Sequence, residues 1–313
     1  MMMTRAEAAA WLQSHDHFCI LTHTRPDGDT VGSSAALCLA LRKMGKTAYI
    51  LENPELSGQL LFLHEGLTKK DISRKDVVVS VDVAAVSMLP KDWQAMAGRI
   101  ELRIDHHEND RSFAPNELVE SQMAACAEVV CALIELLGVE MDAKMGEAVY
   151  VGVSTDTGCF RFPNTTANSF RVAAACVAAG ANIYPLNQML FDTNTMEKLK
   201  VRSWITENAK FYRDGKVALC ALPYEVEKNA TEDDMNNISG FLRSIEGVCM
   251  AALIRQNPDK CRLSVRAVPG YDAAAVCALF GGGGHKGAAG ADLYLTMAEA
   301  EKAVEAALLD AVR

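Results

Sequence analysis

The sequence is short of positive charge and of long apolar runs. Its 313 residues include 31 Lys and Arg against 40 Asp and Glu, which gives a net charge of −9. An acidic chain of this kind is poorly suited to grip long duplex DNA, which needs many Lys and Arg contacts to phosphates. No uninterrupted run of about 18 apolar residues occurs, so we expect no membrane span and no membrane partner. A short phosphorylated substrate held in one pocket is still compatible with this charge.

The ten cysteines include no C-x-x-C pair. Several lie in apolar segments of helical character, such as Cys38 in AALCLAL and Cys131 in EVVCALI. We therefore expect buried free thiols in a reducing compartment instead of disulfides. The first residues, MMMTRAEAAAWLQSHDHF, also lack the apolar core of roughly 7–15 residues that a secretory signal needs. Together these absences predict a soluble, cytoplasmic protein.

From residue 1 to 185 the pattern alternates short β-like runs with longer helical ones. Alternation of this kind predicts an α/β domain with a mainly parallel sheet flanked by helices. The expected strands cover 18–22, 47–53, 77–82 and 99–105, and the expected helices cover 31–45, 124–138 and 143–155.

The pattern changes in the last third of the chain. Residues 186–212 contain no Gly or Pro cluster and are predicted to form a helical connector. Residues 213–313 are predicted to form a smaller α+β domain. Its expected elements are strands within 215–225, 247–256 and 260–268, and a final helix over 297–311.

Acidic and imidazole side chains follow three of the predicted strands and one predicted helix. Ligands bind outside the carboxyl ends of the strands in an open parallel sheet, so we expect these side chains to gather at one edge. They are His23, Asp27 and Asp29 after FCILT, Asp82 after VVVSV, Asp105, His106 and His107 at the end of RIELRI, and Asp156 after GEAVYVGVST.

These residue types indicate which metal they would hold. Ligands that are mostly oxygen, with some imidazole and no thiolate, suit manganese or magnesium better than structural zinc. Two ions about 4 Å apart can clamp the attacking and leaving oxygens of a phosphoryl displacement and activate a bound water. Seven candidate ligands are too many for one ion and natural for two: His23, Asp27, Asp29, Asp82, Asp105, His106 and Asp156.

Each cluster also has a simpler interpretation. RPDGD is a favourable turn sequence, and Asp29 could simply cap the next helix. Asp82 after a strand is uninformative alone, and His106–His107 could be a solvated pair. The combination favours a metal site, because chance would have to place an acid or imidazole at every one of these ends.

The order and approximate spacing of these motifs resemble those of the DHH phosphoesterase superfamily. The motifs are His23-x-x-x-Asp27-x-Asp29, the single Asp82, the Asp105-His106-His107 triplet and Asp156 in STDTG. GGGGHKGAAG, residues 281–290, is similar to the signature of the DHH-associated substrate-binding domain. RPDGDTVGS, IDHHEND, STDTGCFRFPNTT and GGGGH resemble the bacterial bifunctional oligoribonucleases (nanoRNases), which also dephosphorylate adenosine 3',5'-bisphosphate.

The resemblance implies a role for each motif residue. Asp82 would bridge two manganese ions, with magnesium or cobalt as alternatives. His107 would act on the scissile phosphate as electrophile or general acid, and Asp105 would orient a ligand. The first ion would be held by His23, Asp27 and Asp82, and the second by Asp29, Asp82, His106 and Asp156.

The glycine run has a physical interpretation of its own. Four glycines let backbone amides approach a phosphate closely, and His285 adds a donor. A P-loop is excluded, because the run lacks G-K-[ST] and follows no predicted strand; a merely flexible loop is the simpler alternative. The resemblance implies that Arg266 pairs with a terminal phosphate in a cleft between the domains. The implied substrate-binding residues are Arg266, Gly282, Gly283, Gly284 and His285.

The function that the resemblance implies is a manganese-dependent phosphoesterase. It would hydrolyse RNA of about two to five nucleotides to mononucleotides and dephosphorylate the bisphosphate, by two-metal activation of water. A phosphodiesterase of cyclic or linear dinucleotides is the second enzyme hypothesis, and a pyrophosphatase is a weaker one. A nucleotide-binding sensor is the non-enzyme alternative, which a degenerate metal set would favour, whereas the set here is intact. No role is carried onto Arg111 or Ser112, and a homodimer is left open.

Overall fold

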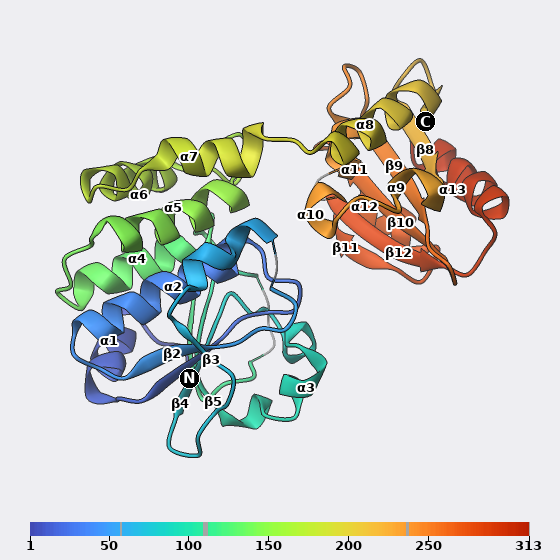
Figure 1. Ribbon diagram of the computed structural model, residues 1–313. Coiled ribbons are helices and arrows are strands. Elements are labelled where there is room, and N and C mark those ends of the chain that lie inside the picture. The colour runs from blue at the N-terminus through green and yellow to red at the C-terminus, as the bar shows by residue number, and fades with distance from the viewer. Residues whose placement is uncertain (57, 109–111, 236–237, 313) are drawn as a thin grey trace. The chain divides into compact units, whose positions relative to one another are not determined.

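The computed structural model describes residues 1–313 except 57, 109–111, 236–237 and 313, and the side chains of 232–233. Asn109, Asp110 and Arg111 therefore lie outside the described residues. The chain divides into two compact units, Met1–Thr193 and Asn194–Arg313 (Figure 1). The division falls inside the segment 186–212 that was expected to be one connector, so α8 (Met196–Asn208) and β7 (Lys210–Tyr212) belong to the second unit.

The first unit contains a six-stranded parallel sheet, as the strand and helix alternation predicted. Its strand order is β3-β2-β1-β4-β5-β6. The chain therefore starts in the middle of the sheet, and the direction of winding reverses between β1 and β4, which is where such sheets bind ligands. The strands are β1 (Phe18–Leu21), β2 (Ala48–Leu51), β3 (Thr68–Lys69), β4 (Val77–Val81), β5 (Ile100–Asp105) and β6 (Asn116–Val119).

Helices cover this sheet on one face and shorter segments cover the other. FCIL and AYIL are buried at every position, as expected of central parallel strands. On the helical face α5 packs between α2 and α6, while Leu89 and Trp93 belong to the core of the opposite face (Figure 1). The helices are α1 (Arg5–Ser14), α2 (Gly28–Lys43), α3 (Lys91–Gln94), α4 (Cys126–Leu136), α5 (Ala143–Asp156), α6 (Ala167–Ala178) and α7 (Ile183–Asn187).

Helix α2 begins three residues earlier than the apolar pattern predicted. Asp27 is its N-cap and accepts hydrogen bonds from the backbone of Asp29 at 3.1 Å and of Thr30 at 3.2 Å. The helix crosses α5 closely at Gly32, where an added Cβ would lie 2.2 Å from the carbonyl oxygen of Ala148. This close crossing brings the start of α2 beside the end of α5.

The second unit is built on a six-stranded mixed sheet of order β11-β12-β10-β9-β8-β7. Only β8 and β9 pair in parallel among its described strands. Helices α12 and α13 pack on one face, and α8 and α11 pack on the other. The remaining elements are β8 (Val217–Leu222), α9 (Tyr224–Glu227), α10 (Glu232–Met235), α11 (Ile238–Arg243), β9 (Met250–Gln256), β10 (Cys261–Ala267), α12 (Ala273–Ala278), β11 (Gly283–His285), β12 (Ala288–Leu293) and α13 (Met297–Ala311).

The glycine run forms part of a β-hairpin, so the simpler alternative of a merely flexible loop is wrong. β11 and β12 pair antiparallel within GGGGHKGAAG. An added Cβ on Gly282 would lie 2.2 Å from the Gly290 carbonyl oxygen, and one on Gly284 would lie 2.6 Å from that of Ala288. Gly284 also has φ +145°. The glycines are therefore needed for close strand approach, a requirement that composition alone did not reveal.

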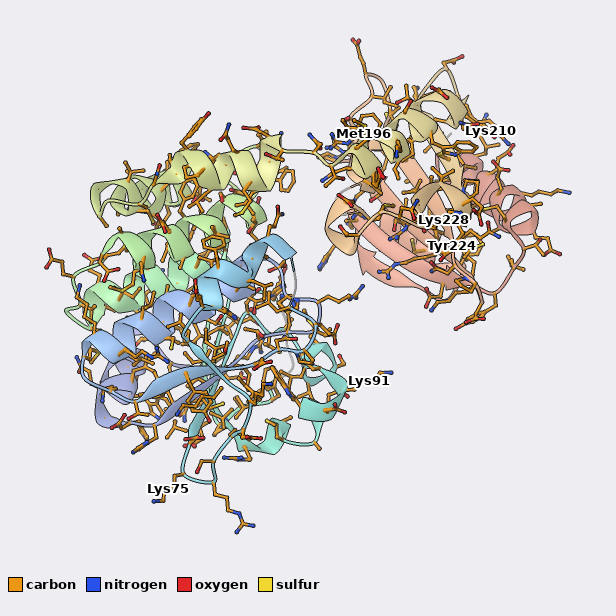
Figure 2. The ribbon with its side chains drawn as sticks, viewed as in Figure 1. Lys75, Lys91, Met196, Lys210, Tyr224 and Lys228 are labelled. Carbon is orange, nitrogen blue, oxygen red and sulfur yellow. The ribbon has the colours of Figure 1, made fainter. Side chains whose placement is uncertain are left out.

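The sequence led us to expect neither a membrane-spanning helix nor a disulfide bond. Among the described residues, no helix has both the length and the apolar composition needed to cross a bilayer. All ten cysteines are free thiols in the structure, seven of them buried and Cys131, Cys159 and Cys249 partly exposed. Figure 2 shows side chains filling the space between sheet and helices in each unit, whereas Lys75 and Lys91 extend outward.

Candidate metal centre

The residues predicted to bind metal meet at the carboxyl edge of the first sheet. His23 follows β1 and Asp82 follows β4, the two neighbouring strands at the switch point. His106 follows β5, and Asp156 is the last residue of α5. Three donor groups result, each with its ligand atoms within 4.8 Å of one another: His23–Asp27–Asp82, Asp29–His106–Asp156 and Asp82–His106–His107.

The first group is centred on His23. Its Nε2 lies 3.5 Å from Asp27 Oδ1 and 3.5 Å from Asp82 Oδ2. Its Nδ1 lies 2.8 Å from the carbonyl oxygen of Thr24. Because a carbonyl oxygen can only accept, Nδ1 carries a proton and Nε2 faces the two carboxylates. Although burial opposes it, the pKa of His23 rises to about 11 beside Asp27 and Asp82, so Nε2 is protonated until a cation takes the place of that proton.

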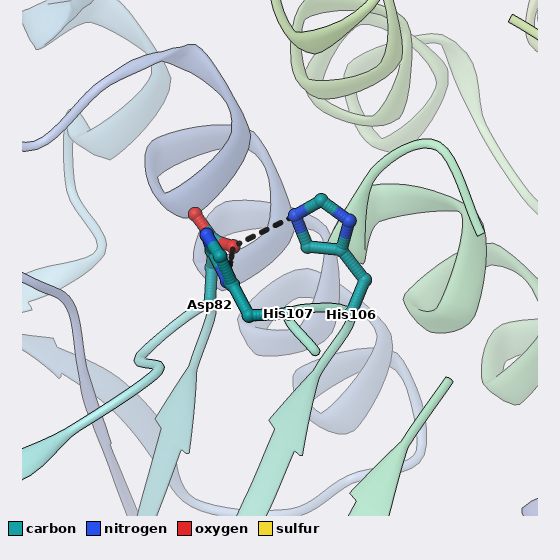
Figure 3. Close-up of side chains that lie close together, drawn as sticks. All are labelled: Asp82, His106 and His107. Atoms are coloured by element: carbon teal, nitrogen blue, oxygen red, sulfur yellow. Dashed lines mark ion pairs between the residues drawn. The ribbon is translucent and has the colours of Figure 1, made fainter. Parts of the chain in front are cut away.

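The second group is centred on His106. Its Nε2 lies 3.7 Å from Asp29 Oδ2 and 3.4 Å from Asp156 Oδ2. The same nitrogen lies 3.4 Å from Asp82 Oδ1, so Asp82 directs one oxygen to each group. Figure 3 shows the rings of His106 and His107 turned toward this carboxylate. Asp82 therefore has one oxygen near the histidine of each of these two groups, and it is itself a member of the first and third groups.

These donor atoms fit divalent cations. Ligand atoms about 2.1 Å from one ion lie about 3.0–3.5 Å from each other, close to the separations observed. The buried Oδ1 of Asp82 accepts no hydrogen bond from the described residues, which is costly for a carboxylate unless a cation compensates it. Carboxylates and imidazoles without thiolate are the donor set of manganese or magnesium.

Crowding of acids shifts the protonation of the whole cluster. Burial, followed by the charge of Asp27, raises the pKa of Asp156 to about 7. Burial and the charges of Asp82 and Asp156 raise the pKa of Asp29 well above its usual range. Although burial opposes it, the pKa of His106 rises to about 10 beside Asp82 and Asp29. A cation would replace these protons, so metal binding should release protons.

Asp29 is held by the start of another helix. Its side chain is fully buried, and its oxygens accept hydrogen bonds from the backbone of Cys126 at 2.6 Å and of Ala127 at 2.9 Å. These amides belong to the first turn of α4, where the helix dipole favours a negative charge. An added Cβ on Gly152 would lie 2.8 Å from Asp29 Oδ1. Sequence reasoning missed this support, because the contacting segments are far apart in the chain.

Asp105 lies in none of the three donor groups, although it was counted among the seven candidate ligands. Its Oδ1 accepts a hydrogen bond from His107 Nδ1 at 2.8 Å and from the backbone of His106 at 2.8 Å. His107 therefore keeps Nε2 for other partners, and its side chain is one-third exposed. The hydrogen bond to Asp105 raises the pKa of His107. Asp105 thus orients His107 instead of facing the donor groups.

Arg103 and Glu117 complete this arrangement and were missed from the sequence. Arg103 is 1% exposed and donates to Asp105 Oδ2 from Nη2 at 2.5 Å and from Nε at 3.1 Å. Its Nη1 lies 3.7 Å from Glu117 Oε1. The Phe113 ring packs over the guanidinium, with its centroid 4.9 Å from Arg103 Cζ. In IELRID the alternation of strand side chains would turn Arg103 to solvent with Glu101. In the structure Arg103 pairs across the sheet with Glu117 on β6, a strand that the sequence did not predict.

The backbone of Asp82 is strained. Asp82 has φ +57°, a left-handed conformation that residues with a side chain seldom adopt. Strain of this kind persists only where the surroundings hold it, and it concentrates at functional sites. Here the backbone amide of Asp82 donates to Ile104 of the next strand at 2.9 Å. The turn thus directs the shared carboxylate between the two groups.

In the second unit, the predicted substrate-binding residues share one face of the sheet. Arg266 on β10 pairs with Ala288 on β12, which in turn pairs with His285 on β11. Paired residues project to the same face, so Arg266 and His285 stand about 10 Å apart, two inter-strand spacings, with only the small Ala288 between them. Gly283, Gly284 and His285 are exposed, and Arg266 is half-buried.

Comparison with known proteins agrees with this architecture. The model of the DHH family N-terminal domain matches residues 17–153, and that of the DHHA1 domain matches residues 214–312. The chain is 33% identical over 277 residues to the bifunctional oligoribonuclease and PAP phosphatase NrnA of Thermus thermophilus, covering 88% of this chain and 83% of that relative. It is 25% identical over 316 residues to the cyclic-di-AMP phosphodiesterase PdeA of Listeria monocytogenes, covering 94% of this chain and 47% of that relative.

Two solved structures share the fold. An exopolyphosphatase-related protein of Bacteroides fragilis superposes with a TM-score of 0.86 at 24% identity, covering 98% of this chain and 96% of that one. The exonuclease RecJ bound to manganese superposes with a TM-score of 0.56 at 14% identity, covering 98% and 94%. The resemblance inferred from the motifs is confirmed, and the chain belongs to the DHH family, with curated relatives that are hydrolases.

Proposed function

We propose that this chain is a two-manganese phosphoesterase that hydrolyses short RNA to mononucleotides and removes a terminal phosphate from adenosine 3',5'-bisphosphate. The observation that carries the proposal is Asp82, one buried carboxylate with an oxygen toward each of two donor groups. The name of the Thermus thermophilus relative supports the two substrates, and the manganese bound by RecJ supports the metal.

The groups centred on His23 and on His106 would each hold one ion. His23, Asp27 and Asp82 would hold the first, and Asp29, Asp82, His106 and Asp156 would hold the second. When bound, the ions supply Lewis acidity to the phosphoryl oxygens and to a nucleophilic water. Magnesium and cobalt are the alternative ions for the same donor atoms.

His107 is the proposed proton donor of the protein. Asp105 keeps its Nδ1 protonated and its ring oriented, so a protonated Nε2 can donate to a phosphoryl oxygen as charge develops there. The buried Arg103 fixes the Asp105 carboxylate in turn. The pair His107–Asp105 therefore acts as a pre-oriented acid next to the shared ligand Asp82, whose Oδ1 is 3.5 Å from His107 Nδ1.

The second unit would capture the far end of the substrate. Arg266 and His285 offer a guanidinium and an imidazole donor on one face, and the exposed backbone of Gly283 and Gly284 can approach a phosphate closely. The free thiols support a place in the reducing cytoplasm.

A hydrolysis panel with manganese tests the proposal. Purified protein should release mononucleotides from di- to pentanucleotide RNA and phosphate from the bisphosphate. The Listeria monocytogenes relative supports a second candidate, a phosphodiesterase of cyclic or linear dinucleotides, so both belong in the panel with pyrophosphate. Activity only on cyclic dinucleotides would favour that candidate, and no turnover of any substrate would favour a nucleotide sensor.

A further inference from the structure

The segment that follows Asp156 has an unusual backbone. Gly158, Cys159 and Phe160 have φ of +57°, +57° and +61°. Three successive residues in the left-handed region are rare, because a side chain clashes there with the neighbouring backbone. Such a conformation is kept only when surrounding contacts hold it, and it often marks a functional segment.

Those contacts are present on the inner side of the segment. The backbone amide of Phe160 donates to Thr157 Oγ1 at 3.1 Å. The Phe160 ring lies among other aromatic rings, with its centroid 6.1 Å from that of Tyr150 and 5.2 Å from that of Phe170. Phe160 therefore anchors the turn, and the chain reverses so that Phe162 is exposed.

The Phe162 ring is seated on Gly158. An added Cβ on Gly158 would lie 2.4 Å from the ring atoms Cε1 and Cζ, so no other residue type leaves room for the ring in this position. The backbone amide of Phe162 donates to the Thr157 carbonyl oxygen at 2.9 Å, which fixes the position of the Phe162 backbone. Phe162 nevertheless stays 40% exposed. The Phe162 ring therefore packs on the backbone of Gly158 while part of the ring is exposed to solvent.

Hydrogen bonds tie this segment to the metal centre on two sides. Asn164 Nδ2 donates to the carbonyl oxygen of Asp156 at 3.1 Å and to that of Ala124 at 3.1 Å. Asp156 belongs to the second donor group, and Ala124 follows Met123, whose carbonyl oxygen accepts from His106 Nδ1 at 3.2 Å. The segment that carries the Phe162 ring therefore borders the second donor group.

We propose that Phe162 is a stacking platform for a nucleobase of the substrate, beside the phosphate that is cleaved. This inference rests on the proposed function and names the part of the substrate that the Phe162 ring recognises. An aromatic ring accepts any base, because every base has a π face, whereas the donor residues contact only phosphate. The chain would thus prefer nucleotides over plain phosphate esters without preferring a sequence.

Three variants test this role in a diadenylate assay. Phe162→Leu keeps an apolar side chain on Gly158 but removes the π face, and we expect KM to rise about tenfold. Phe162→Trp keeps the π face and should stay within about twofold of the unmodified enzyme. Phe211→Leu is the matched control, because Phe211 is similarly exposed at 48% but lies on β7, the edge strand opposite β11. It should leave KM unchanged.

Dinucleotides that lack one base identify the contact. When the base on one particular side of the phosphate is absent, the unmodified enzyme and Phe162→Leu should have equal KM, and removal of the other base should leave the difference intact. An equal rise of KM for the full and both base-free substrates would show that the ring only packs the segment, and would overturn the proposal. So would an unchanged KM in Phe162→Leu.

A binding measurement separates this inference from the proposed function. The dissociation constant of diadenylate is compared between Asp82→Ala and Asp82→Ala/Phe162→Leu, so that no turnover is needed. Weaker binding of the double variant to diadenylate, but not to the dinucleotide lacking the stacked base, supports the platform even if the unmodified protein hydrolyses nothing. Equal binding of both variants contradicts it, even if hydrolysis is normal.

Discussion

The metal centre of the first unit and the glycine hairpin of the second differ in how firmly their side chains are held. Asp29 and Asp105 are fully buried and bonded to backbone amides, and Asp82 is kept in a left-handed conformation. Gly283 and His285 are exposed on an edge strand. The proposed metal ligands are thus fixed in advance at a cost in strain and charge repulsion, whereas the proposed capture residues are exposed.

The largest effect should come from removing the shared ligand. Asp82→Ala takes away one oxygen from each donor group, so kcat should fall by roughly 10³-fold or more. Steady-state hydrolysis of diadenylate measures this, with circular dichroism to check folding. A folded variant that keeps a tenth of the activity would contradict the bridging role and remove the contrast between the two regions.

A smaller loss should follow from altering the group that orients His107. Asp105→Asn keeps the shape but weakens the hold on His107 Nδ1, so kcat should fall about 100-fold while KM changes little. Arg103→Lys is the paired variant, since it keeps a charge beside Asp105 while losing the two-point contact made by Nε and Nη2. Its kcat should lie between those of Asp105→Asn and the unmodified enzyme. A rise of KM alone in Asp105→Asn would place this residue with the capture groups instead.

A buried histidine should make the first unit sensitive to acid. His64 is 3% exposed and lies 2.9 Å from Ser34 Oγ, and burial lowers its pKa to about 4 from an ordinary 6.5. The unfolded chain therefore binds a proton at higher pH than the folded chain does, so stability falls as the pH drops from 6.5 toward 4. Between pH 7 and 5 the loss should be about 2 kcal/mol.

Urea unfolding at both pH values measures this loss. His64→Leu cannot take up the proton and should lose less stability over the same interval, whatever its stability at pH 7. If the variant and the original chain lose the same amount, His64 is not the responsible group.

The capture residues should give the mildest effect. Arg266→Met or His285→Ala should raise KM about tenfold and leave kcat within about threefold, because each removes one hydrogen bond to a charged phosphate. Arg262→Met is the matched control, since Arg262 projects from the same face of β10 but pairs with Asp292. A tenfold loss of kcat at unchanged KM would show that the hairpin takes part in the chemistry.

The sequence predicted the parts that depend on local pattern. Continuous apolar runs identified β1 and β4, and the acids that follow these runs could be assigned to one sheet edge from the pattern alone. The edge strand β6 and the hairpin β11–β12 were missed, because NELV is short and glycine-rich strands carry no apolar alternation. Arg103 was missed for a related reason, since its partner Glu117 lies on β6. Long-range pairing decides these features, and no local pattern encodes it.

Electron paramagnetic resonance of the manganese-loaded protein tests the central claim most directly. Two ions about 4 Å apart and bridged by Asp82 should give the spectrum of an exchange-coupled pair, with two manganese per chain by elemental analysis. Asp82→Ala should lose the coupling and at least one ion. A single manganese per chain, or two that give an uncoupled spectrum in the unmodified protein, would contradict a shared two-metal centre.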